Sequence, residues 1–295
     1  MKILLADDER TIAVTLGDAL RAAGHEVTVA TDGEQALQAL RTETFDCAIT
    51  DIRMPKADGR AVLRAVRETQ PSCRVIVITG AGDRGFCSGL DLKEASDLQG
   101  GFAAEGISGD AIQRGQLKFS GIVEKMRSCP QPVIAAVNGA AMGAGLSFAM
   151  AADVRIASPQ AKFCASYINI GTGGADMGSS YFLWRIVGWG MAAEMLLTGR
   201  VIEVEEAHRI GLVNHVYPFE ELLERAMEMA RRMAEKPPLA LRMTKDAISI
   251  GLNSGSLRDT LRLEDRNQVL LIESLYMAGM MLAGAPPESQ RKDLR

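Results

Sequence analysis

Three aspartates stand where short apolar runs of the sequence end. Asp7 and Asp8 follow "KILLA", and Asp51 follows "CAIT". Runs of this length are typical of buried parallel strands, and ligand sites of parallel sheets lie at the carboxyl ends of the strands. Carboxylates gathered there repel one another unless a cation joins them, and Mg²⁺ prefers oxygen ligands. The spacing predicts an acidic cation site, although such residues can also simply end strands and cap helices.

The motifs "ILLADDE", "DIRMPKADG" and "VIVITG", in that order, resemble the receiver domain of response regulators. The resemblance implies that Asp51 accepts a phosphoryl group, with a histidine kinase as partner, and that Thr79 is the switch hydroxyl. It also implies a Mg²⁺ site whose ligands are Asp7, Asp8, Asp51 and the carbonyl of Arg53. A receiver continues to a fifth strand that ends in a Lys-Pro pair. No such pair follows at a suitable distance here, so the resemblance is to a truncated receiver.

From Arg74 onward the sequence contains four successive blocks, "RVIVITGAGDRGFCSGLDLKEA", "PQPVIAAVNGAAMGAGLSFAMAADVRIAS", "IGTGGADMGSSYFLWRIVG" and "LLTGRVIEVEEAHRIGLVNHV". Together these blocks resemble another family, the crotonase superfamily of enoyl-CoA hydratases and isomerases. The resemblance implies an enzyme that acts on an acyl-CoA substrate without a cofactor. Such enzymes form a thioester enolate, whose oxyanion needs hydrogen-bond donors fixed in advance.

Two glycine-containing turns match the oxyanion positions of this family. The resemblance assigns one donor to the amide of Leu90 in "CSGLD" and the other to the amide of Ala144 in "MGAGLSF". Ala144 stands at the start of a helix predicted from about Gly143, and the amino end of a helix favours an anion. Small residues there would equally suit tight packing of the helix on a strand. The CoA-binding residues implied by the resemblance are Ser88, Gly89, Leu90, Asp91, Lys93, Gly143 and Ala144.

The acid-base positions depart from the hydratase pattern. Where a hydratase carries two glutamates, this sequence has Ser147 and Tyr167, and neither is a carboxylate base. Asp176 in "GGADMGSSY" matches a position where some isomerases of the superfamily carry a working aspartate. The alternative for Asp176 is an N-cap of the helix "MGSSYFLWRIVG", and Tyr167 can equally be a packing residue.

The elements that must position these residues indicate an α/β fold. We expect flavodoxin-like receiver βα units that lead into a crotonase ββα spiral, followed by a C-terminal helical region. The expected parts are a truncated receiver segment at 1–80, a spiral core at 74–220 and a helical oligomerisation region at 221–295. The strand at 74–80 satisfies both families and is shared between them. Crotonases use such terminal helices to form trimers and hexamers, so a homo-oligomer is expected.

The composition excludes several other classes of protein. The 33 Lys and Arg residues against 37 Asp and Glu give a net charge of −4, so nothing favours binding to nucleic acid or to an anionic membrane. "MKILLADDE" lacks the apolar core of a signal peptide, and no run is long enough to cross a membrane. The five cysteines form no CxxC pair and lie in or beside apolar runs, which is typical of buried free thiols in a cytoplasmic protein.

Three functional hypotheses follow from the sequence. The first is a crotonase-type enzyme whose isomerase-like chemistry fits Asp176 better than simple hydration. The second is a signalling module in which phosphorylation of Asp51 controls the remainder. The third is a non-catalytic acyl-CoA binder, or a fusion without an evolved activity, which the substituted glutamates and both truncations suggest.

Overall fold

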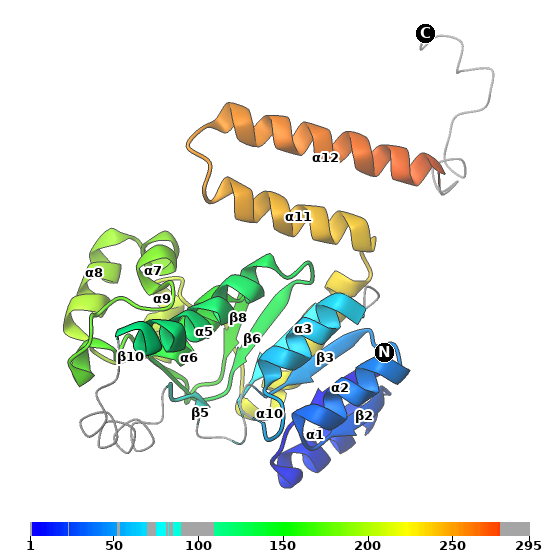
Figure 1. Cartoon of the computed structure of the whole chain (residues 1–295), viewed down its shortest axis with the longest axis horizontal. Helices are drawn as coiled ribbons and strands as arrows, with labels where there is room; N and C mark the ends of the chain where they lie inside the picture. Colours follow the sequence, from blue (N-terminus) through cyan, green and yellow to red (C-terminus); the bar gives the residue numbers. More distant parts are fainter. Residues whose placement is uncertain are drawn as a thin grey trace. The chain divides into compact units, whose positions relative to one another are not determined.

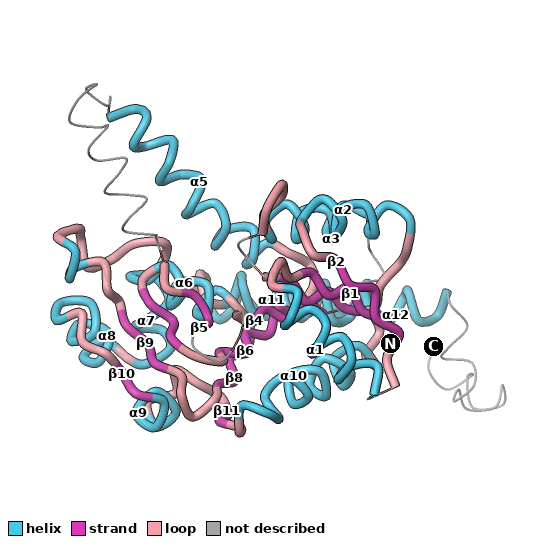
Figure 2. Tube along the Cα trace, turned by 90° about the horizontal axis from the view of Figure 1, so that it is seen from below, coloured by secondary structure: helices cyan, strands magenta, loops and turns pink. Residues whose placement is uncertain are grey.

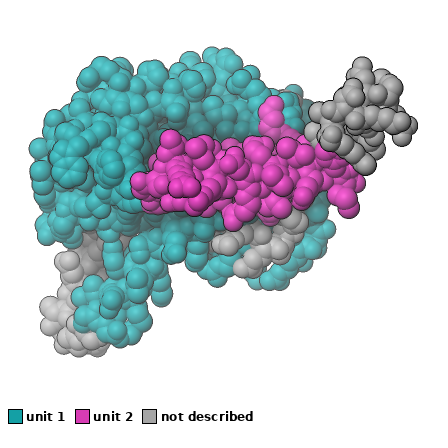
Figure 3. All heavy atoms as spheres, turned by 90° about the horizontal axis from the view of Figure 1, so that it is seen from above, with its two compact units in different colours: residues 1–235 teal, residues 236–295 magenta. Residues whose placement is uncertain are grey.

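The computed structural model describes residues 2–22, 24–51, 54–69, 75–80, 82, 85–89 and 109–277. The chain divides into two compact units, residues 1–235 and 236–295, which Figure 3 shows in different colours.

The first unit alternates strands and helices along most of its length. Its elements are β1 (Lys2–Ala6), α1 (Arg10–Ala22), β2 (Glu26–Ala30), α2 (Gly33–Thr42), β3 (Cys47–Thr50), α3 (Gly59–Thr69), β4 (Val75–Thr79), β5 (Gly85–Cys87), α5 (Gly109–Ser128), β6 (Val133–Val137), β7 (Ala140–Met142), α6 (Ala144–Ala151), β8 (Val154–Ala157), β9 (Lys162–Cys164), the short 3₁₀ helix η1 (Ile168–Ile170), α7 (Ser179–Val187), α8 (Trp189–Thr198), β10 (Ile202–Glu203), α9 (Val204–Arg209), β11 (His215–Val216) and α10 (Phe219–Ala234).

Seven parallel strands form one sheet, in the order β11-β8-β6-β4-β3-β1-β2 (Figure 2). Strand β4 pairs with β3 on one side, where Cys47 faces Val75, and with β6 on the other, where Thr79 faces Ala136. The receiver type of sheet has the strand order 2-1-3-4-5. Strand β6 therefore takes the position of a receiver's fifth strand, and β4 joins two sets of strands in one continuous sheet.

Helices cover both faces of this sheet (Figure 1), in agreement with the almost entirely apolar sequences of its central strands. Val75 and Val77 of β4 belong to the core beneath α1 and α10, whereas Ile76 and Ile78 belong to the core beneath α2, α3, α5 and α6. The alternation follows from the two-residue period of a strand. The central strands are thus buried on both sides by helices from different parts of the sequence.

Helix α10 lies within the first unit, although its sequence groups naturally with the helices that follow. Its apolar stripe is buried against the sheet and consists of Leu222, Ala226, Met227 and Ala230. Nη2 of Arg231 donates a hydrogen bond of 2.7 Å to Nε2 of His25, just before β2. The boundary between the compact units therefore falls after Glu235 and not at residue 220.

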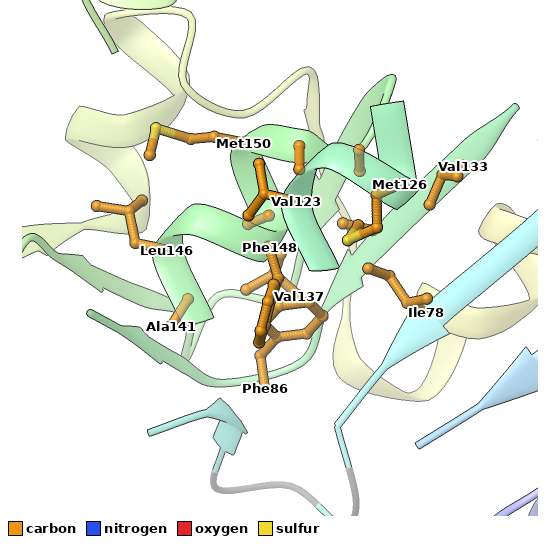
Figure 4. Close-up of a cluster of buried hydrophobic side chains, with 14 of the residues drawn as sticks. Ile78, Phe86, Val123, Met126, Val133, Val137, Ala141, Leu146, Phe148 and Met150 are labelled. Atoms are coloured by element: carbon orange, nitrogen blue, oxygen red, sulfur yellow. The ribbon is translucent and has the colours of Figure 1, made fainter. Parts of the chain in front are cut away.

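A second, smaller sheet has the strand order β10-β9-β7-β5. Strands β5, β7 and β9 are parallel, and β10 runs antiparallel to β9. Strand β5 follows β4 in the chain and β7 follows β6, so neighbouring strands of the large sheet each continue into a strand of the small one. Phe86 of β5 packs in one buried cluster with Val137 of β6 and Phe148 of α6 (Figure 4).

The second unit contains the helices α11 (Pro238–Gly251) and α12 (Leu257–Met277), joined by a short connection. Helix α11 begins at a proline, whose missing N–H costs nothing at the first helical position. The α/β class with a helical C-terminal region agrees with the expectation from the sequence.

Cys47, Cys129 and Cys164 are buried, Cys87 is half-buried, and none of the four is in a disulfide. Cys73 lies outside the described residues. Within the described part of the chain, no helix is long and apolar enough to cross a membrane.

Candidate active site

The turn after β5 lies against the turn between β7 and α6. Gly89 has φ +89°, and a Cβ atom added to it would lie 3.0 Å from the Met142 carbonyl oxygen and 3.6 Å from the Ala144 nitrogen. A side chain at position 89 would therefore be strained and crowded, and glycine permits the close approach. Of the residues that the sequence assigns to acyl-CoA binding, this geometry brings together Ser88, Gly89, Gly143 and Ala144, whereas Leu90, Asp91 and Lys93 lie outside the described residues.

Ala144 is the first residue of α6, and its amide belongs to the helix turn whose N–H groups have no acceptor within the helix. Gly143 precedes it with φ +51° and ψ −113°, and the Gly143 amide donates to the Cys164 carbonyl oxygen at 2.9 Å. The next residue, Gly145, is packed so tightly that an added Cβ would lie 2.0 Å from the Cys87 carbonyl oxygen. The amino end of α6 is thus held against both β5 and β9.

Ser147 and Tyr167 form a buried pair of hydroxyl groups behind this turn. Their oxygens lie 2.6 Å apart, and the side chain of Ser147 is fully buried. The Tyr167 ring also lies beside Gly143, where an added Cβ would be 3.6 Å from it. Burial raises the pKa of the Tyr167 hydroxyl above its usual range, against the opposing effect of its hydrogen bond with Ser147. The pair therefore stays neutral and cannot serve as a carboxylate-like base.

Asp176 lies next to this pair. Its carbonyl oxygen is 3.4 Å from Oγ of Ser147, and its carboxylate accepts hydrogen bonds from the Met177 amide at 2.7 Å and from Nε2 of Gln116 in α5. The residue that caps α7 is Gly178, without a side-chain hydrogen bond, so the carboxylate of Asp176 is not the N-cap. The carboxylate of Asp176 is half-buried, and the side chain of Gln116 orients it. Sequence reasoning missed Gln116, because no motif includes this residue.

A further polar side chain that sequence reasoning missed is Asn138, directly after β6. Its buried amide hydrogen-bonds to Gly80, Gly82 and Gly85, on the connection from β4 to β5. The only signal in the sequence was an Asn-Gly pair after an apolar run, which is ordinary in a turn.

The comparisons with known proteins decide the family. The family model described as "Enoyl-CoA hydratase/isomerase" matches residues 58–281. The chain is 37% identical over 232 residues to the "Probable enoyl-CoA hydratase echA12" of Mycobacterium bovis, covering 78% of this chain and 79% of the relative. The chain belongs to the enoyl-CoA hydratase/isomerase family.

The solved structures similar to this chain include proteins described as hydratase/isomerase and as isomerase. The enoyl-CoA hydratase/isomerase from Cupriavidus metallidurans CH34 matches with a TM-score of 0.67 and 31% identity, over 82% of this chain and 92% of that one. A monofunctional enoyl-CoA isomerase from M. smegmatis matches with a TM-score of 0.54 and 36% identity, over 68% of this chain and 82% of that one. Membership in the enoyl-CoA hydratase/isomerase family therefore does not select between the two reactions.

The amino-terminal part matches a different family. The response regulator receiver domain model matches residues 3–89, so both resemblances found in the sequence are confirmed. The two matches overlap at residues 58–89, which contain β4, the strand shared by the receiver order and the rest of the sheet.

The acidic residues of the receiver match lie at adjacent strand ends. Asp7 follows β1 and Asp51 follows β3, where the register pairs Ala6 with Thr50. Asp7 is 5% exposed, and its Oδ1 accepts the Glu9 amide at 2.9 Å. Burial, followed by the nearby charges of Asp51 and Asp8, raises the pKa of Asp7 to about 6. These carboxylates therefore lie close enough for the charges of Asp51 and Asp8 to raise the pKa of Asp7, as expected for an acidic cluster.

A metal centre is not assembled by the described side chains. Among residues 2–277, apart from the gaps given above, no group of three or more His, Cys, Asp or Glu residues is arranged to hold a metal ion. The side chain of Asp8 is exposed, and Arg53 lies outside the described residues. The Mg²⁺ ligand set implied by the receiver resemblance stays a prediction, because one of its four ligands lies outside the described residues. Thr79, the expected switch residue, donates its hydroxyl to the Ala136 carbonyl oxygen of β6 at 2.8 Å.

Proposed function

We propose that the chain converts acyl-CoA thioesters through an enolate whose oxygen accepts hydrogen bonds from the amides of Leu90 and Ala144. The observation that carries the proposal is the approach of Gly89 to the amide nitrogen of Ala144, because it brings the two glycine turns into contact. Preorganised backbone donors contribute most when the transition state develops charge at a fixed place. Ser88, Asp91, Lys93 and Gly143 would hold the CoA part of the substrate around these turns.

The proposed base is Asp176. Its carboxylate removes a proton next to the carbonyl, the electron pair of the C–H bond forms a carbon–carbon double bond, and the carbonyl π pair moves to the oxygen. Return of the same proton to another carbon of the conjugated system completes an isomerisation with no net change of atoms or electrons. Gln116 orients the carboxylate for this transfer.

Isomerase-like chemistry is favoured over simple hydration because the glutamate positions of a hydratase carry Ser147 and Tyr167. Hydration needs carboxylates that hold and deprotonate a water molecule, and these hydroxyls are already hydrogen-bonded to each other. Tyr167 and Ser147 are proposed to shape the pocket beside the base.

Exchange of the α-protons of butyryl-CoA into deuterated water tests this function, because exchange requires the enolate but no product. The wild-type protein should incorporate deuterium, and Asp176→Asn should lose about 10²-fold or more of the rate. The matched control is Asp246→Asn, on the exposed side of α11, which should exchange like the wild type. Binding of butyryl-CoA without exchange would make the protein an acyl-CoA binder and would refute the enzymatic proposal.

A second candidate function is a phospho-acceptor module centred on Asp51. It is favoured by the receiver match over residues 3–89 and by the proximity of Asp51 to the buried Asp7. A histidine kinase would be the phosphate donor, with Thr79 as the responding hydroxyl. Treatment with acetyl phosphate, with and without Mg²⁺, should label Asp51 in the wild type and nothing in Asp51→Asn. An unlabelled wild-type protein would remove this candidate.

A homotrimer or hexamer is proposed as the working assembly. Helix α12 exposes apolar side chains that include Leu257, Val269 and Tyr276, which is unusual for a helix that faces water on its own. Light scattering of the full chain after size-exclusion chromatography tests this, and a monomer at micromolar concentration would contradict it.

A further inference from the structure

Asn138 stands where the two sheets meet. It follows β6 directly, and Gly139 alone separates it from β7. Only 2% of the residue is exposed. A buried amide is stable only when its donors and acceptor are paired. The partners of Asn138 therefore indicate what this residue holds in place.

Its side chain contacts residues from the end of β4 to the start of β5, and Oγ1 of Thr79 lies 3.5 Å from its Oδ1. Nδ2 donates to the carbonyl oxygens of Gly80 at 3.0 Å, Gly82 at 2.6 Å and Gly85 at 3.2 Å. Oδ1 accepts the Gly80 amide at 3.0 Å. One side chain thus fastens both ends of the connection from β4 to β5.

The connection is also closed by packing. A Cβ atom added to Gly80 would lie 2.0 Å from the Gly85 carbonyl oxygen, so the two ends of the connection touch. The backbone of Asn138 is fixed in turn, because Oγ of the fully buried Ser158 donates to its carbonyl oxygen at 2.8 Å. The amide therefore projects from a strand end that is itself hydrogen-bonded onto Gly80, Gly82 and Gly85.

Both glycine turns of the candidate active site begin a few residues beyond this amide. Strand β5 runs from Gly85 to Cys87 and leads into Ser88 and Gly89, and β7 runs from Ala140 to Met142 and leads into Gly143. The two strands pair in parallel, with Gly85 opposite Ala140. A displacement of the connection at Gly85 is therefore carried along the short strand β5 to the turn at Gly89.

We propose that Asn138 is a positioning residue for the candidate active site, which sets the position of the Gly89 turn relative to the amide of Ala144 by fastening β5 to the end of β6, which leads into β7. It touches no substrate. The inference rests on the proposed enolate chemistry, and it adds a residue that acts through the two turns. Misplacement of a catalytic group by about 1 Å can cost about 10²-fold in rate, so a loosened β5 should be visible in turnover.

The test compares Asn138→Ala and Asn138→Asp with the wild type in the full-length chain. Asp keeps the acceptor for the Gly80 amide and loses the donors to the three carbonyl oxygens, so it separates the two halves of the contact. The matched control is Gln131→Ala. Gln131 is also a buried amide, 5% exposed, but it lies just before β6, at the end opposite to Asn138. Each protein is examined for deuterium exchange of butyryl-CoA, for its affinity for butyryl-CoA and for its melting temperature.

A spectroscopic measurement separates positioning from general stability. The infrared stretch of a ¹³C-labelled thioester carbonyl in bound butyryl-CoA should shift to lower frequency in the wild type, because two donors polarise it. We expect both Asn138 variants to lose most of this shift and about 10- to 100-fold in exchange rate. The Gln131 variant should keep the shift and the rate even where its melting temperature falls.

Three results would overturn the inference. The first is that the folded Asn138 variants shift the infrared stretch of the bound thioester carbonyl as far as the wild type does. The second is a loss of exchange in Gln131→Ala equal to that in Asn138→Ala at equal stability. The third is global unfolding of both Asn138 variants, which would make Asn138 a residue of the core. Absence of exchange in the wild type would instead refute the proposed function, so the two failures are distinguishable.

Discussion

Gly145 of α6 lies against Cys87 of β5 so closely that a methyl group at position 145 would come within 2.0 Å of the Cys87 carbonyl oxygen. The contact joins the amino end of a buried helix to the strand that leads into the opposite turn. The spacing between these elements is therefore set by backbone packing, and a small change in one residue should propagate to the site.

Gly145→Ala should force α6 away from β5 and lower the rate of α-proton exchange by about 10- to 100-fold. A buried overpacking of this kind also costs about 1–3 kcal/mol of stability. Gly121→Ala is the matched control, because Gly121 lies on helix α5 with open space around it. That control should keep its activity and gain up to about 1 kcal/mol from helix propensity. Equal exchange rates in both variants would show that the packing of α6 on β5 does not control the site.

Tyr167→Phe should leave exchange within about threefold of the wild-type rate, because the phenol stays neutral and takes no proton. It removes the 2.6 Å hydrogen bond to Ser147 and so should cost about 1 kcal/mol in the free energy of unfolding. Urea denaturation and exchange kinetics check the two effects separately. A large loss of exchange at unchanged stability would give Tyr167 a direct part in the chemistry.

Asp7→Asn should stabilise the protein at neutral pH. The folded-state pKa of about 6 lies above the ordinary value of 3.8, so the folded protein binds the proton more tightly. The cost of the charged carboxylate is complete above pH 6 and disappears as the pH falls below 4. We expect a gain of about 1–3 kcal/mol at pH 7 and little gain near pH 3.5, by denaturant titration. A destabilised variant at pH 7 would contradict this sign.

Lower pH should weaken the contact between His25 and Arg231. Burial, followed by the charge of Arg231, lowers the pKa of His25 below its ordinary value of 6.5. The unfolded chain therefore binds this proton more readily, and stability is lost as the pH falls below about 6.5. His25→Gln should show a smaller loss of stability between pH 8 and pH 5.5 than the wild type. An identical pH dependence in the two proteins would exclude His25 as the cause.

Local patterns predicted the individual elements well. The apolar run "VIVIT" became the buried strand β4, and the helix predicted from about Gly143 begins at Ala144 as α6. These succeed because strand burial and helix starts are determined by neighbouring residues. The turns around Gly89 and Gly143 could also be predicted from the sequence. Both glycines have positive φ angles, which favour glycine, so the residue type itself marks each turn.

Contacts between distant residues were not predictable in the same way. The pairing of Thr79 with Ala136 joins residues far apart in sequence, and no local pattern specifies that register. Gln116 and Asn138 acquire their roles only when α5 and β6 are placed beside Asp176 and Gly80. The apolar stripe of α10 predicted a helix, but it did not predict that the helix would cover the sheet.

The structure of the protein with bound butyryl-CoA tests the central claim most directly. We predict that the thioester oxygen lies about 2.7–3.1 Å from the amide nitrogens of both Leu90 and Ala144. We also predict that the Asp176 carboxylate faces the α-carbon. A thioester bound elsewhere, or one whose oxygen contacts neither amide, would contradict the proposed enolate chemistry.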